Sequence, residues 1–186
     1  MHRHRKVYLP TYGRWEEGKW FARGDVARAF DTRFGRMGLL ICEDLWHASL
    51  PYLLWQDGAD ILILISASLN RGERDGLRTA DKVIALNRAY ALAFTDFVIH
   101  VNRAGEENGH AYWGGSTIYG PDMALLAEGP RYEPALVRAT LDTDDLKPAR
   151  LDLPLLRDER GDLTARELAR IVGHNVGRDA GLNQAG

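Results

Sequence analysis

The chain lacks the features that several protein classes require. It has a single cysteine, Cys42, among 186 residues, which excludes an internal disulfide and makes the reducing cytoplasm the expected location. Its formal net charge of -2 gives no reason to expect a nucleic acid or a membrane surface as a partner. No long hydrophobic run, internal repeat or low-complexity segment interrupts it, and the apolar stretch after the basic run 2–6 is too short for a signal peptide or a membrane span.

The apolar residues that are present predict an α/β chain. Short apolar runs bounded by turn residues predict strands over 37–41, 60–66 and 97–102, with 60–66 buried on both faces. Apolar residues at helical spacing predict helices over 44–57 and 77–95. A strand, helix, strand order implies a right-handed parallel crossover.

Antiparallel additions to this sheet are expected from segments that alternate in polarity. They are 26–34, which forms a hairpin with 37–42 through the turn Gly35-Arg36, and 136–141. The segments 116–119 and 124–127, which flank the turn Gly120-Pro121-Asp122, are expected to be added in the same way. The glycine-rich segment 104–115 is expected to be a loop that lines or covers a pocket.

The C-terminal part is expected to leave the sheet. Prolines and a charged run predict an extended arm from Lys147 onward. Thr164 is expected to cap a short helix over 165–172, and the last residues, 173–186, to be frayed.

Cys42 lies where the strand 37–41 gives way to a helix. A thiol at that point feels the positive end of the helix dipole and lies beside unpaired backbone N–H groups, which lower its pKa and can hold a developing oxyanion. This position favours a nucleophile. The alternative is a small buried hydrophobe, as most lone intracellular cysteines are.

Two other arrangements of reactive side chains are weaker. Asp44 and His47 are spaced for a shared metal, but no third ligand lies nearby in sequence, so we expect no metal site. A cysteine-protease-like pair would need His100 or His110. His100 falls within a strand, where a buried histidine is usual, and His110 falls in the glycine-rich segment.

Short motifs along the chain occur in a fixed order. They are Lys6-Val7-Tyr8-Leu9-Pro10, Tyr12-Gly13 with Glu17 and Trp20-Phe21, Ile41-Cys42-Glu43-Asp44-Leu45-Trp46, Gly58-Ala59-Asp60, Ser66-Ala67-Ser68, Asn102-Arg103 and the Gly-x-Ser of 114–116. In this order they resemble the nitrilase (carbon-nitrogen hydrolase) superfamily over about residues 5 to 160. The Cys-Glu-Asp-Leu-Trp form is most similar to the amidase and glutaminase branches.

The resemblance implies a fold and a domain division. The implied fold is α/β, a four-layer α-β-β-α sandwich of two mixed β-sheets, lacking its N-terminal part. The implied domain is residues 1–160, followed by a C-terminal helix and tail over 161–186. Family members commonly pair through helices near the nucleophile and C-terminal arms, so a homodimer or larger homo-oligomer is expected.

The resemblance also implies a Cys-Lys-Glu catalytic set. Cys42 is the thiolate that attacks the amide or nitrile carbon, and Lys6 is the ammonium that stabilises the oxyanion beside the backbone N–H of Glu43. Glu17 matches an acidic position near the lysine, where it would orient Lys6 or the water, and Glu16 is the neighbouring alternative if the alignment shifts by one residue.

Substrate contacts are expected from the residues around this set. Glu43, Trp46 and Tyr12 are assigned to substrate binding. Glu43 and Asp44 are expected to orient the turn rather than react, because a carboxylate beside the thiol would raise its pKa. The chemistry needs no metal and no organic cofactor.

One catalytic residue of the family has no counterpart. The family's general base is a glutamate on a strand well before the lysine, and only residues 1–5 precede Lys6. A start assigned at an internal methionine, a truncated gene product and a glutamate supplied by a partner are the three explanations, the first being preferred. Without the base, hydrolysis is expected to be slower by roughly a hundred to ten thousand fold.

The sequence therefore predicts a cysteine-dependent hydrolase of a small amide or nitrile that acts through a thioester. A glutaminase module of an NAD synthetase-like enzyme is an alternative, although no Ser-Gly-Gly-x-Asp-Ser loop is present and the synthetase would have to be another chain. The other alternative is a truncated, non-catalytic binding or interaction protein that keeps the pocket without the base.

Overall fold

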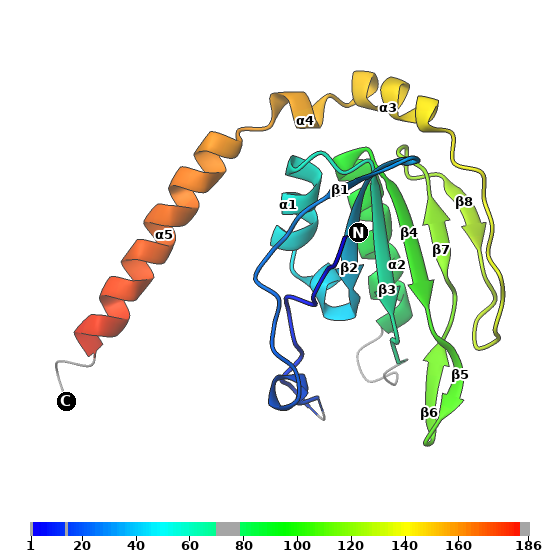
Figure 1. Cartoon of the computed structure of the whole chain (residues 1–186), viewed down its shortest axis with the longest axis horizontal. Helices are drawn as coiled ribbons and strands as arrows, with labels where there is room; N and C mark the ends of the chain where they lie inside the picture. The colour runs from blue at the N-terminus through cyan, green and yellow to red at the C-terminus, as the bar shows by residue number, and fades with distance from the viewer. Residues whose placement is uncertain (1, 14, 70–78, 183–186) are drawn as a thin grey trace. The chain divides into compact units, whose positions relative to one another are not determined.

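The computed structural model describes residues 2–13, 15–69 and 79–182, with side chains described as far as residue 174 (Figure 1). The chain divides into two compact units, Met1–Leu156 and Arg157–Gly186. The domain boundary that the sequence places after residue 160 stays a prediction.

A six-stranded mixed sheet forms the centre of the first unit, in the order β1-β2-β3-β4-β7-β8. Its strands are β1 Phe30–Thr32, β2 Gly35–Ile41, β3 Ile61–Ser66, β4 Phe97–Asn102, β7 Thr117–Tyr119 and β8 Leu125–Glu128. The three central strands β2, β3 and β4 are parallel and the other neighbours are antiparallel. The predicted parallel crossover is confirmed, and the three parallel strands end at one edge of the sheet.

Two helices cover one face of this sheet, α1 Ser49–Gln56 and α2 Thr79–Phe94 (Figure 1). Alternate strand residues, Leu40, Leu62, Leu64 and Val98, pack in the same buried cluster as residues of both helices. Gly38 permits the close approach of α1, because a Cβ there would lie 3.0 Å from Leu54 Cδ1. The buried cluster therefore lies between the helices and the sheet and includes β2 as far as Leu40, two residues before Cys42.

The opposite face of the sheet is only partly covered. Ile61 and Phe97 pack there against Leu146 of α3, Leu146–Asp152. Toward the carboxyl ends of the strands Ile65 is 46% exposed and Val101 is 50% exposed. The prediction that 60–66 is buried on both faces is therefore wrong at its C-terminal end.

Several boundaries differ from the sequence-based ones. The helix expected over 44–57 is two elements, the short 3-10 helix η2 Cys42–Trp46 and then α1. The strand expected over 26–34 is reduced to β1, and no strand forms over 136–141. Alternation of polarity alone does not make a strand, because a strand also needs cross-strand pairing and packing.

The segment expected as a loop, 104–115, is a hairpin of β5 Ala104–Glu107 and β6 His110–Trp113. Its two-residue connection is Asn108-Gly109, with φ values of 52° and 74°. An Asn-Gly pair is the strongest short signal for this turn because both residues tolerate positive φ. The hairpin was therefore available in the sequence, and the glycine content of the segment concealed it.

The segment expected as an extended arm is helical. It forms the 3-10 helix η3 Thr143–Asp145, then α3, and then α4 Leu155–Asp158. The last helix, α5 Gly161–Leu182, is longer than the predicted 165–172, so Thr164 lies inside it rather than at its cap. The frayed end expected from 173 is helical as far as Leu182, and 183–186 lie outside the described residues. No helix in the described part of the chain is both long enough and apolar enough to cross a bilayer.

Arg150 anchors α3 to the sheet through two carboxylates. Its Nη1 donates to Asp60 Oδ1 at 2.9 Å and its Nη2 donates to Asp96 Oδ1 at 2.8 Å. Asp96 is completely buried. Burial raises the pKa of Asp96 to about 8, although the Arg150 guanidinium opposes that rise. Because the protonated form is favoured in the folded state, Asp96 contributes stability that is present below pH 4 and is lost as the pH rises toward 8.

The Arg150→Met variant should lower the free energy of unfolding in a pH-dependent way. At pH 6 the loss should be about 1–2 kcal/mol, from the missing hydrogen bonds. At pH 9 it should be larger, because Asp96 then ionises without a cation beside it. Urea unfolding at the two pH values measures both losses. Equal losses would contradict this account, and Arg157→Met, which removes an exposed ion pair with Asp158, should change neither value.

Candidate active site

Cys42 lies at the carboxyl end of β2 in a strained turn. Its φ is 50°, in the left-handed region that residues with a side chain rarely adopt. The turn directs the thiol into a cavity of about 760 Å³ at the carboxyl edge of the parallel strands. The lining residues are Lys6, Pro10, Tyr12, Trp15, Glu17, Ile41, Cys42, Glu43, Trp46, Ile65, Ser66, Ala67, Ser68, Leu69, Thr79, Lys82 and Tyr112.

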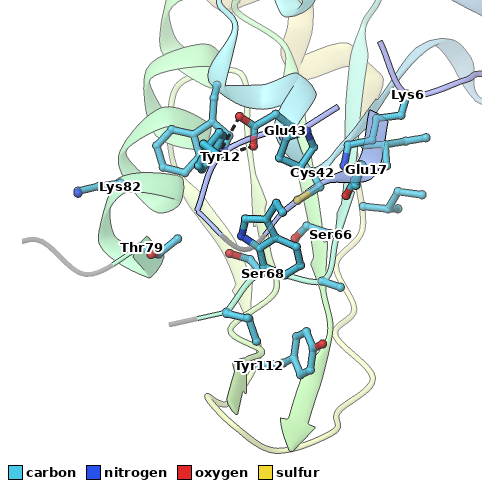
Figure 2. Close-up of a pocket in the computed structure, with 17 residues that line it drawn as sticks. Lys6, Tyr12, Glu17, Cys42, Glu43, Ser66, Ser68, Thr79, Lys82 and Tyr112 are labelled. Atoms are coloured by element: carbon cyan, nitrogen blue, oxygen red, sulfur yellow. Dashed lines mark hydrogen bonds and ion pairs between the residues drawn. The ribbon is translucent and has the colours of Figure 1, made fainter. Parts of the chain in front are cut away.

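Lys6 and Glu17 form a close ion pair in this cavity. Lys6 Nζ lies 2.6 Å from Glu17 Oε2, with the two side chains 14% and 27% exposed. Figure 2 shows the pair on one side of the Cys42 sulfur. Glu16 instead pairs with Lys19 in an exposed contact of 2.6 Å and does not line the cavity. The structure thus brings together the three residues expected to be catalytic and places Glu17, rather than Glu16, beside the lysine; their roles stay predictions.

Asp44 joins the Lys6 segment to the Cys42 turn. It is completely buried, and its Oδ1 accepts the backbone N–H groups of Val7 at 3.0 Å and Tyr8 at 2.9 Å. Its Oδ2 accepts the Ile41 N–H at 3.0 Å and lies 3.2 Å from His4 Nε2. The carboxylate therefore binds the residues on both sides of the site, as expected of a residue that orients the turn.

The electrostatic surroundings of Cys42 only partly match the expectation. Burial is the largest influence and raises the pKa of the Cys42 thiol, whereas Lys6 lowers it, Glu43 and Glu17 raise it, and the Ala67 backbone N–H, which donates to the sulfur, lowers it. The expected net lowering by a helix dipole is wrong, because η2 is a single short 3-10 turn and the thiol is largely desolvated. A thiolate here depends on Lys6 and on the Ala67 N–H.

A second polar pair lies across the cavity from Lys6. The Tyr12 hydroxyl donates to the Glu43 carboxylate, at 3.0 Å from Oε1 and 2.9 Å from Oε2 (Figure 2). Trp46 also lines the cavity and is 40% exposed. The three residues assigned to substrate binding thus line the cavity, and their contact with a substrate stays a prediction.

Other lining residues were given no role by the sequence. Ser66 is the last residue of β3, Ala67 and Ser68 follow it, and Tyr112 comes from the β5–β6 hairpin. Residues after neighbouring parallel strands meet at one edge of a sheet, so the Ser-Ala-Ser after a predicted strand was the available signal. The hairpin contributes Tyr112, in line with the expectation that 104–115 borders the pocket.

In the part of the chain that the structure describes, no histidine lines the cavity of Cys42. His100 is buried, burial lowers its pKa to about 4, and its Nε2 lies 2.9 Å from Ser66 Oγ. His47 stacks on Tyr8 with ring centroids 3.5 Å apart, and His110 begins β6. Among the described residues no group of three or more His, Cys, Asp or Glu side chains is placed to hold a metal ion.

Comparison with known proteins identifies relatives of this arrangement. A family model described as carbon-nitrogen hydrolase matches residues 1–151. The N-carbamoylputrescine amidase of Solanum lycopersicum is 28% identical over 169 residues, which are 86% of this chain and 56% of that protein. The chain thus spans a little over half the length of this relative.

Solved structures share the fold. A carbon-nitrogen hydrolase from Helicobacter pylori G27 superposes with a TM-score of 0.80 at 26% identity, over 88% of this chain and 60% of that one. A mutant amidase from Nesterenkonia sp. AN1, at 25% identity and a TM-score of 0.68 over 87% and 54% of the two chains, carries the acetamide moiety of fluoroacetamide on its active-site cysteine. The predicted nitrilase-like α/β fold is confirmed, with the described residues supplying one large sheet and the helices on one of its faces.

The Asp44→Asn variant tests the link between the two segments. The asparagine amide has the shape of the carboxylate, but its NH₂ group would face backbone N–H groups that need an acceptor. The free energy of unfolding should therefore fall by about 2–4 kcal/mol. Alkylation of Cys42 by iodoacetamide should also slow at temperatures where the variant is folded, because Lys6 is no longer held. Thermal unfolding and alkylation rates measure the two effects. Asp142→Asn, which weakens an exposed helix cap, is the control and should leave alkylation unchanged; unchanged alkylation in Asp44→Asn would contradict the link.

Proposed function

The chain belongs to the carbon-nitrogen hydrolase family, and on that premise we propose that it hydrolyses a small-molecule amide through a thioester on Cys42. The observation that carries the proposal is the presence of Cys42 and the Lys6–Glu17 ion pair in one cavity. A nucleophile, a fixed positive charge and a carboxylate are the groups that acyl transfer from an amide requires.

The first half of the reaction forms the thioester. The Cys42 sulfur attacks the amide carbon, and the carbonyl oxygen becomes an oxyanion beside the Lys6 ammonium and the backbone N–H of Glu43. The carbon–nitrogen bond then breaks, and the leaving nitrogen departs as ammonia or an amine after gaining the proton that the thiol lost. We assign the relay of that proton to Glu17, and its hydrogen bond with Lys6 supports this role.

The second half releases the acid. Water attacks the thioester carbon, the carbon–sulfur bond breaks, and Cys42 regains its proton. The sum is amide plus water to carboxylic acid plus ammonia or amine, so no oxidant, metal or organic cofactor enters. The adduct on the cysteine of the Nesterenkonia amidase supports this role for Cys42.

A second candidate is binding of an amide without turnover. It is favoured by one observation, the burial that raises the pKa of Cys42 and so lowers the fraction of thiolate. Both candidates use the same cavity, and turnover separates them.

Ammonia release from a panel of amides tests the hydrolase. Glutamine, acetamide and an N-carbamoyl amine are suitable first members, and glutamine also tests the glutaminase alternative. Cys42→Ala should abolish release, and Lys6→Met should reduce it by about a hundred to a thousand fold, as expected for loss of an oxyanion donor. Binding of an amide by the wild-type protein without any release of ammonia would favour the second candidate.

Glu17→Gln tests the carboxylate of the ion pair. We expect kcat to fall by about ten to a hundred fold with a smaller change in KM, since the proton relay acts on the transition state. Glu16→Gln is the matched control, one residue away and paired with an exposed lysine, and should leave both constants unchanged. Equal effects of the two substitutions would remove Glu17 from the mechanism.

A further inference from the structure

The turn after β3 touches the nucleophile through its backbone. Ser66, Ala67 and Ser68 all line the cavity, and the Ala67 N–H donates to Cys42 Sγ (Figure 2 shows Ser66 and Ser68 beside the sulfur). A backbone N–H can stabilise a thiolate only if the turn that carries it is held in place.

One side chain holds both ends of this turn. Asn102 Oδ1 accepts a hydrogen bond from Ser66 Oγ at 2.8 Å and from the Ser68 backbone N–H at 2.9 Å. Its Nδ2 donates to the Gly114 carbonyl at 3.0 Å, and its own N–H donates to Ser116 Oγ at 3.0 Å. Asn102 is only 6% exposed, so these bonds are shielded from water.

The direction of each hydrogen bond follows from the backbone partners. The Ser68 N–H must meet an acceptor and the Gly114 carbonyl must meet a donor, which fixes the orientation of the Asn102 amide. Ser66 has one hydroxyl hydrogen and gives it to Asn102, so His100 Nε2 carries a hydrogen and donates to Ser66 Oγ at 2.9 Å. The Ser66 hydroxyl is therefore not aimed at a substrate, and the network ends at Asn102 rather than relaying a proton to the cavity.

We propose that Asn102 is a positioning residue for the nucleophile: its amide, supported by Ser66 and His100, fixes the Ser66–Ser68 turn so that the Ala67 N–H stays directed at Cys42 Sγ. The inference rests on the proposed role of Cys42. It adds a residue that touches neither the substrate nor the sulfur but acts on the sulfur through the turn.

Lys6, Glu17 and Glu43 are the charged groups that shift the pKa of Cys42, and Lys82 also lines the cavity. Asn102 hydrogen-bonds to Ser66, Ser68, Gly114 and Ser116, so removing its amide should leave the influence of the charged groups on the thiol in place. The neutral N–H of Ala67 is the interaction that should weaken, and a weaker hydrogen bond to the thiolate raises the pKa of Cys42.

The test is the pH dependence of Cys42 alkylation by iodoacetamide, which requires no amide substrate. In Asn102→Ala the apparent pKa should rise by about one unit, which makes alkylation at pH 7 about ten fold slower. Ser66→Ala, which keeps the Asn102–Ser68 bond, should shift the profile in the same direction by less, about three fold at pH 7. Val98→Ala is the control, because it truncates a buried side chain of the same strand away from the turn and should leave the profile unchanged.

Each outcome decides one point. A folded Asn102→Ala protein whose profile superposes on that of the wild type overturns the positioning role, and if that variant does not fold, an unshifted Ser66→Ala profile overturns it equally. A Val98→Ala profile shifted as far as Asn102→Ala also overturns it, since the effect would then follow from lost stability alone. If Cys42→Ala releases ammonia from amides as fast as the wild type does, the proposed function fails instead, which is a different result.

Discussion

The hydrogen bonds of one buried carboxylate determine whether this site exists. Asp44 accepts hydrogen bonds from three backbone N–H groups. Two of them belong to Val7 and Tyr8, which follow Lys6 and lie 37 and 36 residues away in sequence, and the third belongs to Ile41, the residue before Cys42. A buried ionised carboxylate is stable only when such donors surround it. The same bonds therefore stabilise the carboxylate and hold the N-terminal segment against the sheet, so the ammonium and the thiol reach one cavity.

The parallel strands give this interaction its setting. β2, β3 and β4 end at the same edge of the sheet. Cys42 directly follows β2, and Ser66 and Asn102 are the last residues of β3 and β4. The helices packed on one face make these strand ends rigid, and the strained turn at Cys42 persists because its neighbours are fixed on both sides. Two buried polar groups, the Asp44 carboxylate and the Asn102 amide, then hold the loops that the sheet does not pair.

The sequence predicted those features that depend on local pattern. Apolar runs located β2, β3 and β4, and the end of one run located Cys42. The Lys6–Glu17 pairing followed from resemblance, since no periodicity connects residues in a loop to a distant strand end. Prediction from local pattern failed in two places. The glycine content of 104–115 concealed the hairpin that turns at Asn108-Gly109, and the prolines after Lys147 suggested an extended arm where the helix α3 forms. Asn102 could not be assigned a role from sequence because its partners lie on two distant segments, 66–68 and 114–116, and the direction of their hydrogen bonds follows only from the fold.

The most direct test of Cys42 as the nucleophile is the intact mass of the protein after it is quenched with acid during incubation with an amide. Peptide mapping then locates the modified residue. We expect a mass increase equal to the acyl group, carried by the peptide that contains Cys42, because the thioester must form before water releases the acid. An acyl group found on any other residue, or ammonia release from a protein whose quenched mass never changes under any condition of substrate and pH, would contradict the central claim that Cys42 is the nucleophile.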